Sequence, residues 1–282
     1  MAVFRTMSAT DLPFAASCAA DEGWSDETLE EFEGFHSHDP DGCFVLEEGG
    51  CRIGIGIATS YGEYGFIGEI IIRPDYRIYG LGRQLMDHAV SYLTKRGVRH
   101  ICLDGVPKAA AFYEQAGFRR VCRSLRFIGS IQGRPNLQVR PMTAGDLESV
   151  FGLDLAAFGA DRSFFLNRLF SLNPELSKVL EDNGKVHGYV FGRRSSGLVW
   201  AGPWYADDQV EQPEHLIESA AIDAAGLPIG LGVLEANNRA VSLVRSLGFS
   251  LRRNPSWRMV MGTSDRLGIS GHLYAIGSAA RG

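Results

Sequence analysis

The sequence predicts two related α/β domains, each with helices packed over a mixed sheet. Three observations lead to this fold class. The chain has 282 residues, which is longer than one typical compact domain and favours two cores. Similar segments recur at a spacing of about 130 residues, as described below. Strand and helix patterns also alternate along each copy, as in α/β and α+β proteins.

The internal repeat is visible near both ends of each copy. Residues 102–118, CLDGVPKAAAFYEQAGF, align without a gap with residues 233–249, VLEANNRAVSLVRSLGF, at an offset of 131 residues. Residues 3–12, VFRTMSATDL, resemble residues 138–147, QVRPMTAGDL, at an offset of 135 residues. Repeats of this length indicate duplicated domains, because solenoid repeats are far shorter.

The repeat places one domain at residues 1–130 and the other at residues 138–282. The linker between them, GSIQGRPNLQ, carries the glycine, proline and polar residues of an irregular connection. Each copy opens with a short strand and a helix capped by serine or threonine.

The remaining elements of the first domain follow in order. Residues 42–62 predict two strands around a Glu-Gly-Gly turn, and residues 66–73, FIGEIIIR, predict a further buried strand. Residues 83–97 show helical spacing of apolar side chains and end at Gly97. The segment HICLDGV then predicts another strand, so the sheet is mixed.

A glycine-containing segment lies between the predicted strand 66–73 and the helix that follows. It reads Arg77-x-x-Gly80-x-Gly82. Glycines at this place let the backbone approach a ligand, and the amides at a helix start bind anions such as a pyrophosphate. A glycine-rich turn that only enters a helix would have the same letters, so this motif alone leaves both interpretations open.

A second motif downstream gives a resemblance to a known family. The residues Phe112-Tyr113-Glu114, followed by Gly117-Phe118, combine with the glycine segment after IIIRPDY. Together they resemble the GNAT superfamily of N-acetyltransferases over nearly the whole first half. The resemblance implies two tandem GNAT-type acyl-CoA N-acyltransferase folds.

The resemblance also implies acetyl-CoA as co-substrate and assigns roles to residues. Tyr113 takes the position of the general acid that protonates the departing thiolate. The strand Ile70, Ile71 and Ile72 would offer amides to the thioester carbonyl. The pyrophosphate would be held by the helix-start segment, namely Arg77, Ile78, Tyr79, Gly80, Leu81, Gly82 and Arg83.

Glu69 is the candidate general base. It is a carboxylate in an otherwise apolar strand, where burial can raise its pKa, and regular alternation would place it on the face of Ile71 and Arg73. The alternative is a structural ion pair of Glu69 with Arg73 or Arg77. For Tyr113, the alternative is a core tyrosine of an amphipathic helix.

The second copy departs from the family pattern at its cofactor loop. No glycine pair precedes its corresponding helix, and Asp207, Asp208 and Glu211 would repel a pyrophosphate. Val244 aligns with Tyr113. We therefore expect a degenerate, catalytically silent domain that could cover the substrate cleft.

Composition narrows the functional classes. The net charge of −5 argues against a nucleic-acid partner, because phosphate-backbone binding needs clustered basic residues. The N-terminus lacks the pattern of a signal peptide and no stretch is long enough to span a membrane, so we expect no membrane association and a cytoplasmic location. Five cysteines without metal-ligand spacing predict reduced thiols and no metal.

The sequence therefore predicts an N-acetyltransferase that acts on a primary amine of a small molecule or peptide. Direct attack in a ternary complex is what the resemblance implies. The alternative is a non-catalytic acyl-CoA-binding sensor or regulatory module. The tandem arrangement is compatible with a monomer or a homodimer.

Overall fold

The computed structural model describes residues 2–24, 26–263 and 267–282, with all their side chains except that of Ile78. The helices of the first half are α1 (Leu12–Asp21), α2 (Leu29–His38), α3 (Leu81–Lys95) and α4 (Ala110–Gln115). Its strands are β1 (Val3–Thr6), β2 (Cys43–Glu48), β3 (Cys51–Tyr61), β4 (Tyr64–Ile72), β5 (His100–Gly105) and β6 (Arg119–Gly129).

The second half repeats this order of elements. Its helices are α5 (Leu147–Phe158), α6 (Ser163–Leu172), α7 (Glu214–Asp223) and α8 (Asn238–Ser246). Its strands are β7 (Val139–Pro141), β8 (Lys178–Asp182), β9 (Lys185–Ser195), β10 (Leu198–Ala206), β11 (Ile229–Leu234), β12 (Ser250–Leu251), β13 (Ser256–Met261) and β14 (Leu273–Ala275).

The start of each copy is built in the same way, as the repeat predicts. The Ser8 amide donates to Asp11 Oδ2 at 2.8 Å, and the Thr143 amide donates to Asp146 Oδ2 at 2.7 Å. These bonds cap the turn before α1 and the turn before α5. In each copy an arginine of the first strand also holds the capping aspartate through two hydrogen bonds, Arg5 in one and Arg140 in the other.

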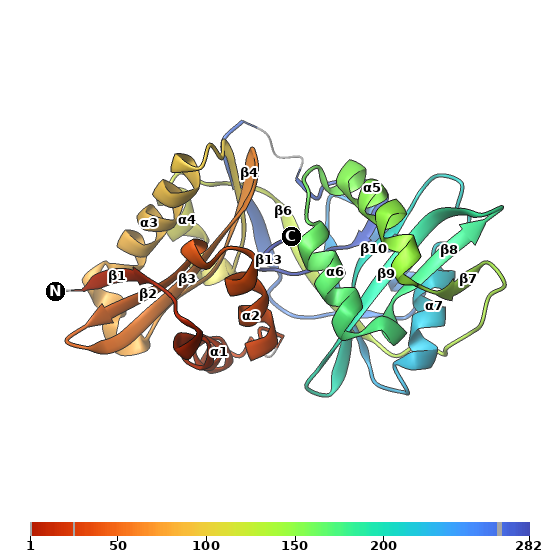
Figure 1. Ribbon diagram of the computed structural model, residues 1–282, viewed down its shortest axis with the longest axis horizontal. Helices are drawn as coiled ribbons and strands as arrows, with labels where there is room; N and C mark the ends of the chain where they lie inside the picture. The colour runs from red at the N-terminus through yellow and green to blue at the C-terminus, as the bar shows by residue number, and fades with distance from the viewer. Residues whose placement is uncertain (1, 25, 264–266) are drawn as a thin grey trace.

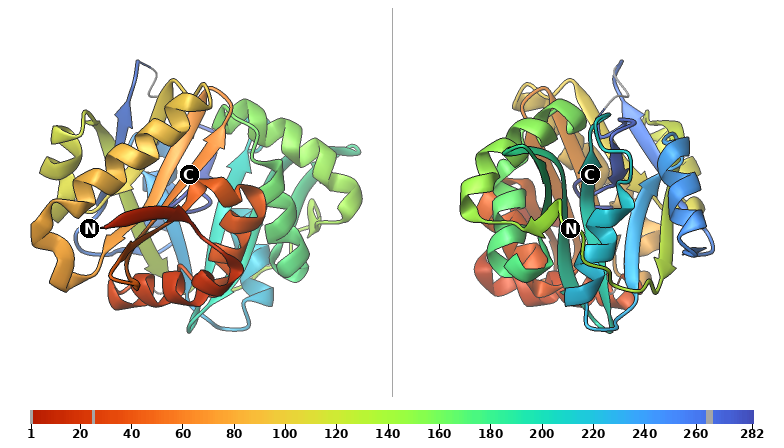
Figure 2. Two further views of the ribbon diagram at one scale, coloured as in Figure 1. Left: turned by 60° about the vertical axis from the view of Figure 1, so that its left-hand side comes forward. Right: turned by 90° about the vertical axis from the view of Figure 1, so that its right-hand side faces the viewer.

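The helices cover both faces of the sheet (Figure 2). Side chains of α1, α2, α5 and α6 share one hydrophobic core, which therefore extends across both halves of the chain. The opposite face carries α3 and α4 over the first half and α7 and α8 over the second, each pair with a core of its own. The predicted mixed α/β fold is confirmed.

One continuous sheet runs through the whole molecule (Figure 1). The strand order is β1-β2-β3-β4-β5-β13-β6-β11-β10-β9-β8-β7, with β12 beside β6 and β14 beside β10. Strand β13 of the second half lies between β5 and β6 of the first, and β6 pairs in turn with β11. The two copies thus exchange strands, and the division into domains 1–130 and 138–282 stays a prediction.

Each copy contains two parallel strands that pair only at their beginnings. Strands β4 and β5 pair from Tyr64 opposite His100 to Phe66 opposite Cys102, although β4 continues to Ile72. Strands β10 and β11 pair over two residues and then diverge in the same way. In the second copy β14 enters this gap, because it pairs with β10 while Ile276 bridges to Gly232 of β11.

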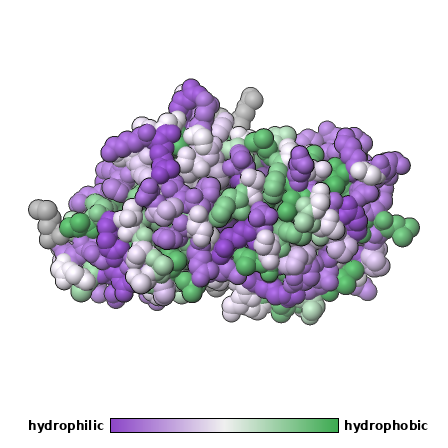
Figure 3. Space-filling model, viewed as in Figure 1, coloured by the Kyte–Doolittle hydropathy of each residue, from purple (hydrophilic) through white to green (hydrophobic). Residues whose placement is uncertain are grey.

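Figure 3 shows the hydropathy of one face of the molecule. In the view of Figure 3, hydrophobic residues are scattered between hydrophilic ones. Among the helices that the structure describes, none has both the length and the apolarity needed to cross a bilayer.

Candidate active site

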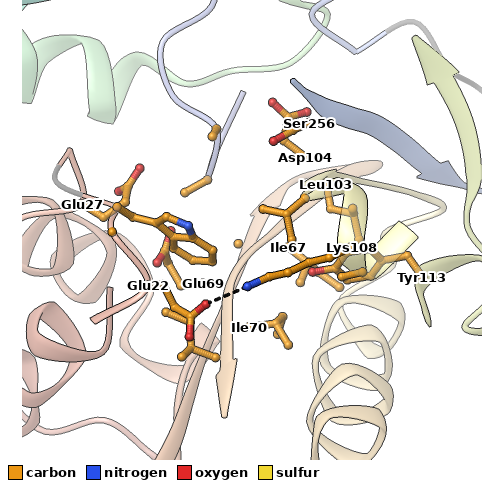
Figure 4. A pocket seen from close by; sticks show the side chains of 18 of the residues that line it. Glu22, Glu27, Ile67, Glu69, Ile70, Leu103, Asp104, Lys108, Tyr113 and Ser256 are labelled. Atoms are coloured by element: carbon orange, nitrogen blue, oxygen red, sulfur yellow. Dashed lines mark hydrogen bonds and ion pairs between the residues drawn. The ribbon is translucent and has the colours of Figure 1, made fainter. Parts of the chain in front are cut away.

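A cavity of about 740 Å³ lies where β4 and β5 diverge. Figure 4 shows Glu27 and Glu69 on one side of it and Tyr113 on the other, with Ser256 and Asp104 beyond them. The first half supplies the connection between α1 and α2, the end of β4, the start of α3, the end of β5 and α4. The second half adds Trp200, residues 252–256 and residues 279–280.

The helix start at one end of the cavity is open to solvent and ligand. Gly80 precedes α3 with φ 69°, the left-handed region that favours glycine, and a Cβ there would meet no atom within 4 Å. A Cβ on Gly82 would reach only Ile72 and Phe112, at 3.9 and 4.0 Å. The first turn of this 15-residue helix therefore presents bare backbone to the cavity, which suits an anion.

Seven of the ten residues predicted for cofactor binding line this cavity, and the side chains of Tyr79 and Leu81 do not. The lining includes Ile70, Ile71, Ile72, Arg77, Gly80, Gly82 and Arg83. Tyr79 is 63% exposed, and Leu81 is buried in the core under α3 because it begins the apolar face of that helix. The side chain of Ile78 lies outside the described part of the chain.

Arg77 is held by groups at the mouth of the cavity. Its Nε donates to the Ile72 carbonyl at 2.8 Å, and its guanidinium pairs with Glu22. Lys108 approaches the same carboxylate to 3.4 Å. Burial is the largest single influence on Glu22 and opposes its charge, but the hydrogen bonds and positive charges of Arg77 and Lys108 together outweigh burial and lower the pKa of Glu22. The Glu22 carboxylate thus holds the side chains of Arg77 and Lys108 beside the open start of α3.

The edge of β4 that faces the cavity is not paired with β5 beyond Phe66. The Arg73 amide donates to the Ile53 carbonyl on β3 at 2.9 Å. Because backbone groups alternate in direction along a strand, the polar groups of Ile72 point to the opposite edge, where β5 has diverged. The hydrogen bond from Arg77 to the Ile72 carbonyl lies at this edge.

A β-bulge in β4 sets the position of Glu69. Ile55 pairs with Ile71 but Ile57 pairs with Gly68, so two residues of β4 face one residue of β3. Glu69 has φ 55°, a left-handed conformation that is unusual for glutamate. The expectation of regular alternation from Glu69 to Ile71 is therefore wrong, because the bulge shifts the strand by one residue.

Glu69 is buried beside further carboxylates. It is 6% exposed, and its Oε2 has no hydrogen-bond partner among the described residues. Burial, and then the negative charges of Glu27 and Asp26, raise the pKa of Glu69 well above its ordinary value. It forms no ion pair with Arg73 or Arg77 in the described structure, so the alternative of a structural ion pair with these residues is not observed.

Glu27 is a site residue that the sequence reasoning missed. It is 5% exposed, it lines the cavity, and its Oε2 also has no partner among the described residues. Burial, followed by the charges of Asp26 and Glu31, raises the pKa of Glu27 to about 7. Glu27 stands in an acidic run, DEGWSDETLEEF, in which no spacing distinguishes it from its neighbours.

Glu31, whose charge acts on both Glu27 and Glu69, stays ionised because two arginines of the second half lie close to it. Arg281 forms an ion pair with Glu31, and Arg193 approaches it to 3.8 Å. Burial disfavours the charge, but these two cations lower the pKa of Glu31 to about 2. The negative charge of Glu31 is thus compensated from the other half of the molecule.

Tyr113 on α4 packs against the end of β5. A Cβ on Gly105 would come within 2.7 Å of two atoms of the Tyr113 ring, so this position needs a glycine. Burial, and to a smaller extent the charge of Glu69, raise the pKa of Tyr113 to about 12. The phenol therefore keeps its proton throughout the neutral range, facing the cavity that Glu69 also lines.

The second half contributes to the wall in ways that the sequence did not predict. Trp200 of β10 lines the cavity. Arg252 and Arg253 come from the connection between β12 and β13. Asp104 at the end of β5 bonds to Arg258 Nε of β13 at 2.5 Å, so strand exchange also fixes this side of the cavity.

The corresponding gap of the second copy is occupied by β14, which pairs with β10 and continues to Ile276 beside β11. Together with the acidic Asp207 and Asp208 after β10, this arrangement makes the second copy unsuited to hold a pyrophosphate. No group of three histidine, cysteine, aspartate or glutamate residues arranged to hold a metal ion occurs in the described ranges.

Comparison with known proteins identifies the family. Residues 9–118 match the Acetyltransferase (GNAT) family, and residues 150–275 match an Acetyltransferase (GNAT) domain. The chain is 24% identical over 230 residues to the uncharacterized N-acetyltransferase YitH of Bacillus subtilis, covering 79% of this chain and 78% of that protein. It is 28% identical over 140 residues to the [ribosomal protein bS18]-alanine N-acetyltransferase of Escherichia coli, covering 48% of this chain and 92% of that enzyme.

A solved structure extends the likeness over the whole length. The crystal structure of a putative acetyltransferase from Pyrococcus horikoshii superimposes with a TM-score of 0.84 at 20% identity, covering all of this chain and 96% of the other. At this identity the likeness concerns the fold. Both halves of the sequence match one family, and the structure places both in one sheet. The chain therefore belongs to the GNAT family of acetyltransferases and consists of two GNAT domains in tandem.

Proposed function

We propose that the first domain transfers the acetyl group of acetyl-CoA to a primary amine of a small molecule or peptide. One observation carries the proposal. The bare helix start at Gly80 and Gly82, the free edge of β4, Glu69 and Tyr113 all face one cavity of about 740 Å³. GNAT acetyltransferases use acetyl-CoA as co-substrate, and one relative is named for acetylating an alanine of a ribosomal protein.

The residues at the cavity suit acetyl-CoA along its length. Amides at Gly80 and Gly82 would bind the pyrophosphate, with the positive charge of Arg83 at the same helix start. The free edge from Ile70 to Ile72 would bind the extended pantetheine chain and direct amides at the thioester carbonyl. Bound there, acetyl-CoA supplies an acyl group on a thiol leaving group.

Glu69 is our candidate for the base that takes a proton from the acceptor ammonium. An amine attacks only as the free base, so one proton must leave before the carbon–nitrogen bond forms. Burial and neighbouring carboxylates make the ionised Glu69 more basic than an exposed glutamate. The bulge in β4 turns its side chain to the cavity.

Tyr113 is our candidate for the acid that protonates the thiolate as the carbon–sulfur bond breaks. It holds its proton at neutral pH, and it faces the cavity from α4. The second proton of the attacking nitrogen then passes to solvent. The overall change converts an ammonium and a thioester into an amide, a thiol and one proton. We further expect a cytoplasmic protein, monomeric or homodimeric, without a metal, nucleic-acid or membrane partner.

The decisive test compares Gly80→Asp with Gly97→Asp. Both glycines have positive φ, 69° and 84°, and a Cβ at either site would meet no atom within 4 Å, but only Gly80 lines the cavity. An aspartate at Gly80 places negative charge at the pyrophosphate site, and we expect acetyl-CoA affinity to fall by about 100-fold, as for a buried like-charge contact of a few kcal/mol.

Calorimetric titration with acetyl-CoA measures the affinity, and thiol release with a panel of amines measures transfer. Gly97→Asp should bind like the wild type, since its strain lies at the far end of α3. Equal affinities for the two variants would remove the assigned cofactor site. Saturable binding without transfer to any amine would instead identify an acyl-CoA sensor.

A further inference from the structure

Three side chains that line the cavity each have a polar atom that is buried without a partner among the described residues. The atoms are Oε2 of Glu27, Oε2 of Glu69 and Nε1 of Trp200, on side chains that are 5%, 6% and 8% exposed. A buried polar atom without a hydrogen bond is costly, so such atoms mark places where a ligand or water completes the bonding. Glu69 and Tyr113 account for chemistry, but Trp200 has no part in it.

These atoms have different hydrogen-bonding capacities. The two carboxylates accept hydrogen bonds and attract positive charge, which suits an ammonium group. The indole nitrogen of Trp200 only donates, so its partner must be an acceptor such as a carbonyl or carboxylate oxygen. A plain alkylamine has an ammonium group that the carboxylates can bind, but it has no acceptor for the indole N–H.

The donor comes from the second domain and is close to the acidic pair. Trp200 belongs to β10, and it shares a side pocket of about 10 Å³ with Asp26 and Arg126. This volume is close to that of one water-sized group. Asp26 lines both the side pocket and the cavity, and it is followed directly by Glu27, which lines the cavity.

A cation adds to the donor at this place. The guanidinium of Arg126 on β6 lines both the cavity and the side pocket. Ser124 and Asp104 hold it there, at 2.9 and 3.5 Å. Arg193 of β9 lies 3.8 Å from the Asp26 carboxylate and offsets its charge. The wall beside Trp200 is therefore suited to an oxygen atom that carries partial or full negative charge.

We propose that the second domain recognises the acceptor through Trp200 Nε1 and Arg126, which bind a carbonyl or carboxylate oxygen a few bonds from the amine. The preferred acceptors are thus amino-carbonyl compounds, such as an amino acid or the first residue of a peptide, and plain alkylamines are poor substrates. This inference rests on the transfer reaction proposed above. It gives the domain without a cofactor site a role in specificity.

The experiment uses pairs of amines that differ in one oxygen-bearing group. Alaninamide and sec-butylamine have the same carbon skeleton around nitrogen apart from the amide, and glycinamide and propylamine form a second pair. The kcat/KM of each amine is measured in the full chain, and the ratio of variant to wild type is taken separately for each amine. This ratio cancels the different basicities of the amines.

Trp200→Phe removes the indole donor and keeps an aromatic ring. We expect kcat/KM for the amides to fall by about fivefold to tenfold more than for the alkylamines, the effect of one lost hydrogen bond. Trp204→Phe is the matched control. Trp204 Nε1 is also buried without a partner in the described structure, but it is fully buried in the second-domain core and does not line the cavity.

The outcomes separate this inference from the proposed function. Selectivity for amides in the wild type, reduced in Trp200→Phe and kept in Trp204→Phe, supports it. Transfer with the same kcat/KM in Trp200→Phe as in the wild type for every amine would overturn the inference and leave the transferase intact. A uniform loss for all amines in Trp200→Phe would also overturn it. Acetyl-CoA binding with no transfer would refute the proposed function and this inference together.

Discussion

Glu27 and Glu69 bring two carboxyl groups into a buried site with few compensating charges. Each lacks a partner for one oxygen in the described structure, and each has a raised pKa because burial and the other acids disfavour its charge. Arg281 and Arg193 lie close to Glu31 and lower its pKa. Glu27 and Glu69 therefore both hold a proton to higher pH than exposed glutamates do.

This arrangement predicts a pH-dependent stability that Glu27→Gln reduces. The pKa of Glu27 rises from 4.5 to about 7 on folding, so between these values the folded chain binds more protons than the unfolded chain. The free energy of unfolding then falls as the pH rises, by up to about 3 kcal/mol across the window. Glutamine removes this contribution, so the variant gains stability relative to wild type between pH 5 and pH 8.

Urea unfolding at pH 5 and pH 8 measures the effect. The control is Glu30→Gln, because Glu30 is exposed on the next helix and carries the same charge. If wild type and Glu27→Gln lose stability equally between the two pH values, Glu27 does not bind a proton on folding.

At the residue scale the sequence predicts site residues where a motif fixes them. Gly80, Gly82 and Tyr113 stand at motif positions, and all three line the cavity. Glu27 and Trp200 could not be predicted, because their roles depend on burial and on contacts between segments far apart in the chain. The predicted face of Glu69 in the strand is wrong, because the sequence EIII at residues 69–72 gives no indication of the one-residue bulge.

At the scale of elements, the diverging strands β4 and β5 create the cavity and α4 closes one side of it. The close fit of α4 depends on the last residue of β5. The Cβ of an alanine at position 105 would lie 2.7 Å from two ring atoms of Tyr113, and neither the ring nor the strand is a flexible chain end. The ring would have to move away from its present position in the wall.

We therefore predict that Gly105→Ala lowers kcat strongly and acetyl-CoA affinity little. A displacement of about 1 Å of a catalytic group can cost about 100-fold in rate, so the variant should approach the kcat of Tyr113→Phe. Steady-state kinetics and calorimetry together measure this. Gly152→Ala is the control, because Gly152 is exposed on α5 with no atom within 4 Å of a Cβ. Wild-type kcat in Gly105→Ala would show that the ring position is unimportant.

The local elements were largely predictable because their patterns are local. The strands around the Glu-Gly-Gly turn are observed as β2 and β3, and the helix predicted at residues 83–97 is observed as α3, Leu81–Lys95. The pairing of these elements was not predictable. The entry of β14 between β10 and β11 joins segments about 40 to 70 residues apart, for which no sequence period exists.

At the scale of the molecule, strand exchange makes the two domains depend on each other. Strand β13 supplies hydrogen bonds to both β5 and β6, and its Arg258 bonds to the buried Asp104 at 2.5 Å. A first domain without β13 would expose the edges of two inner strands and leave Asp104 without this partner. Unpaired inner edges and uncompensated buried charge both oppose folding.

We predict that residues 1–130 alone do not reach the native fold, whereas the full chain unfolds in a single transition. Circular dichroism of the fragment should lack the cooperative thermal transition of the full chain, and calorimetry should detect no acetyl-CoA binding by it. Adding residues 131–282 as a second polypeptide provides the control, since it restores β13. A fragment that folds and binds acetyl-CoA alone would show that residues 1–130 form an autonomous domain.

Strand β14 has a consequence for the history of the duplicated chain. After duplication both copies would have had a gap between two diverging parallel strands. In the second copy this gap is now filled by β14 of the same chain. The segment after β14 continues to Ala279 and Ala280, which form part of the wall of the cavity between β4 and β5. Removing β14 from the gap of the second copy would therefore also displace residues 279–280 from the wall of the cavity in the first. The closed gap of the second copy is therefore coupled through one short segment to the shape of the open cavity in the first.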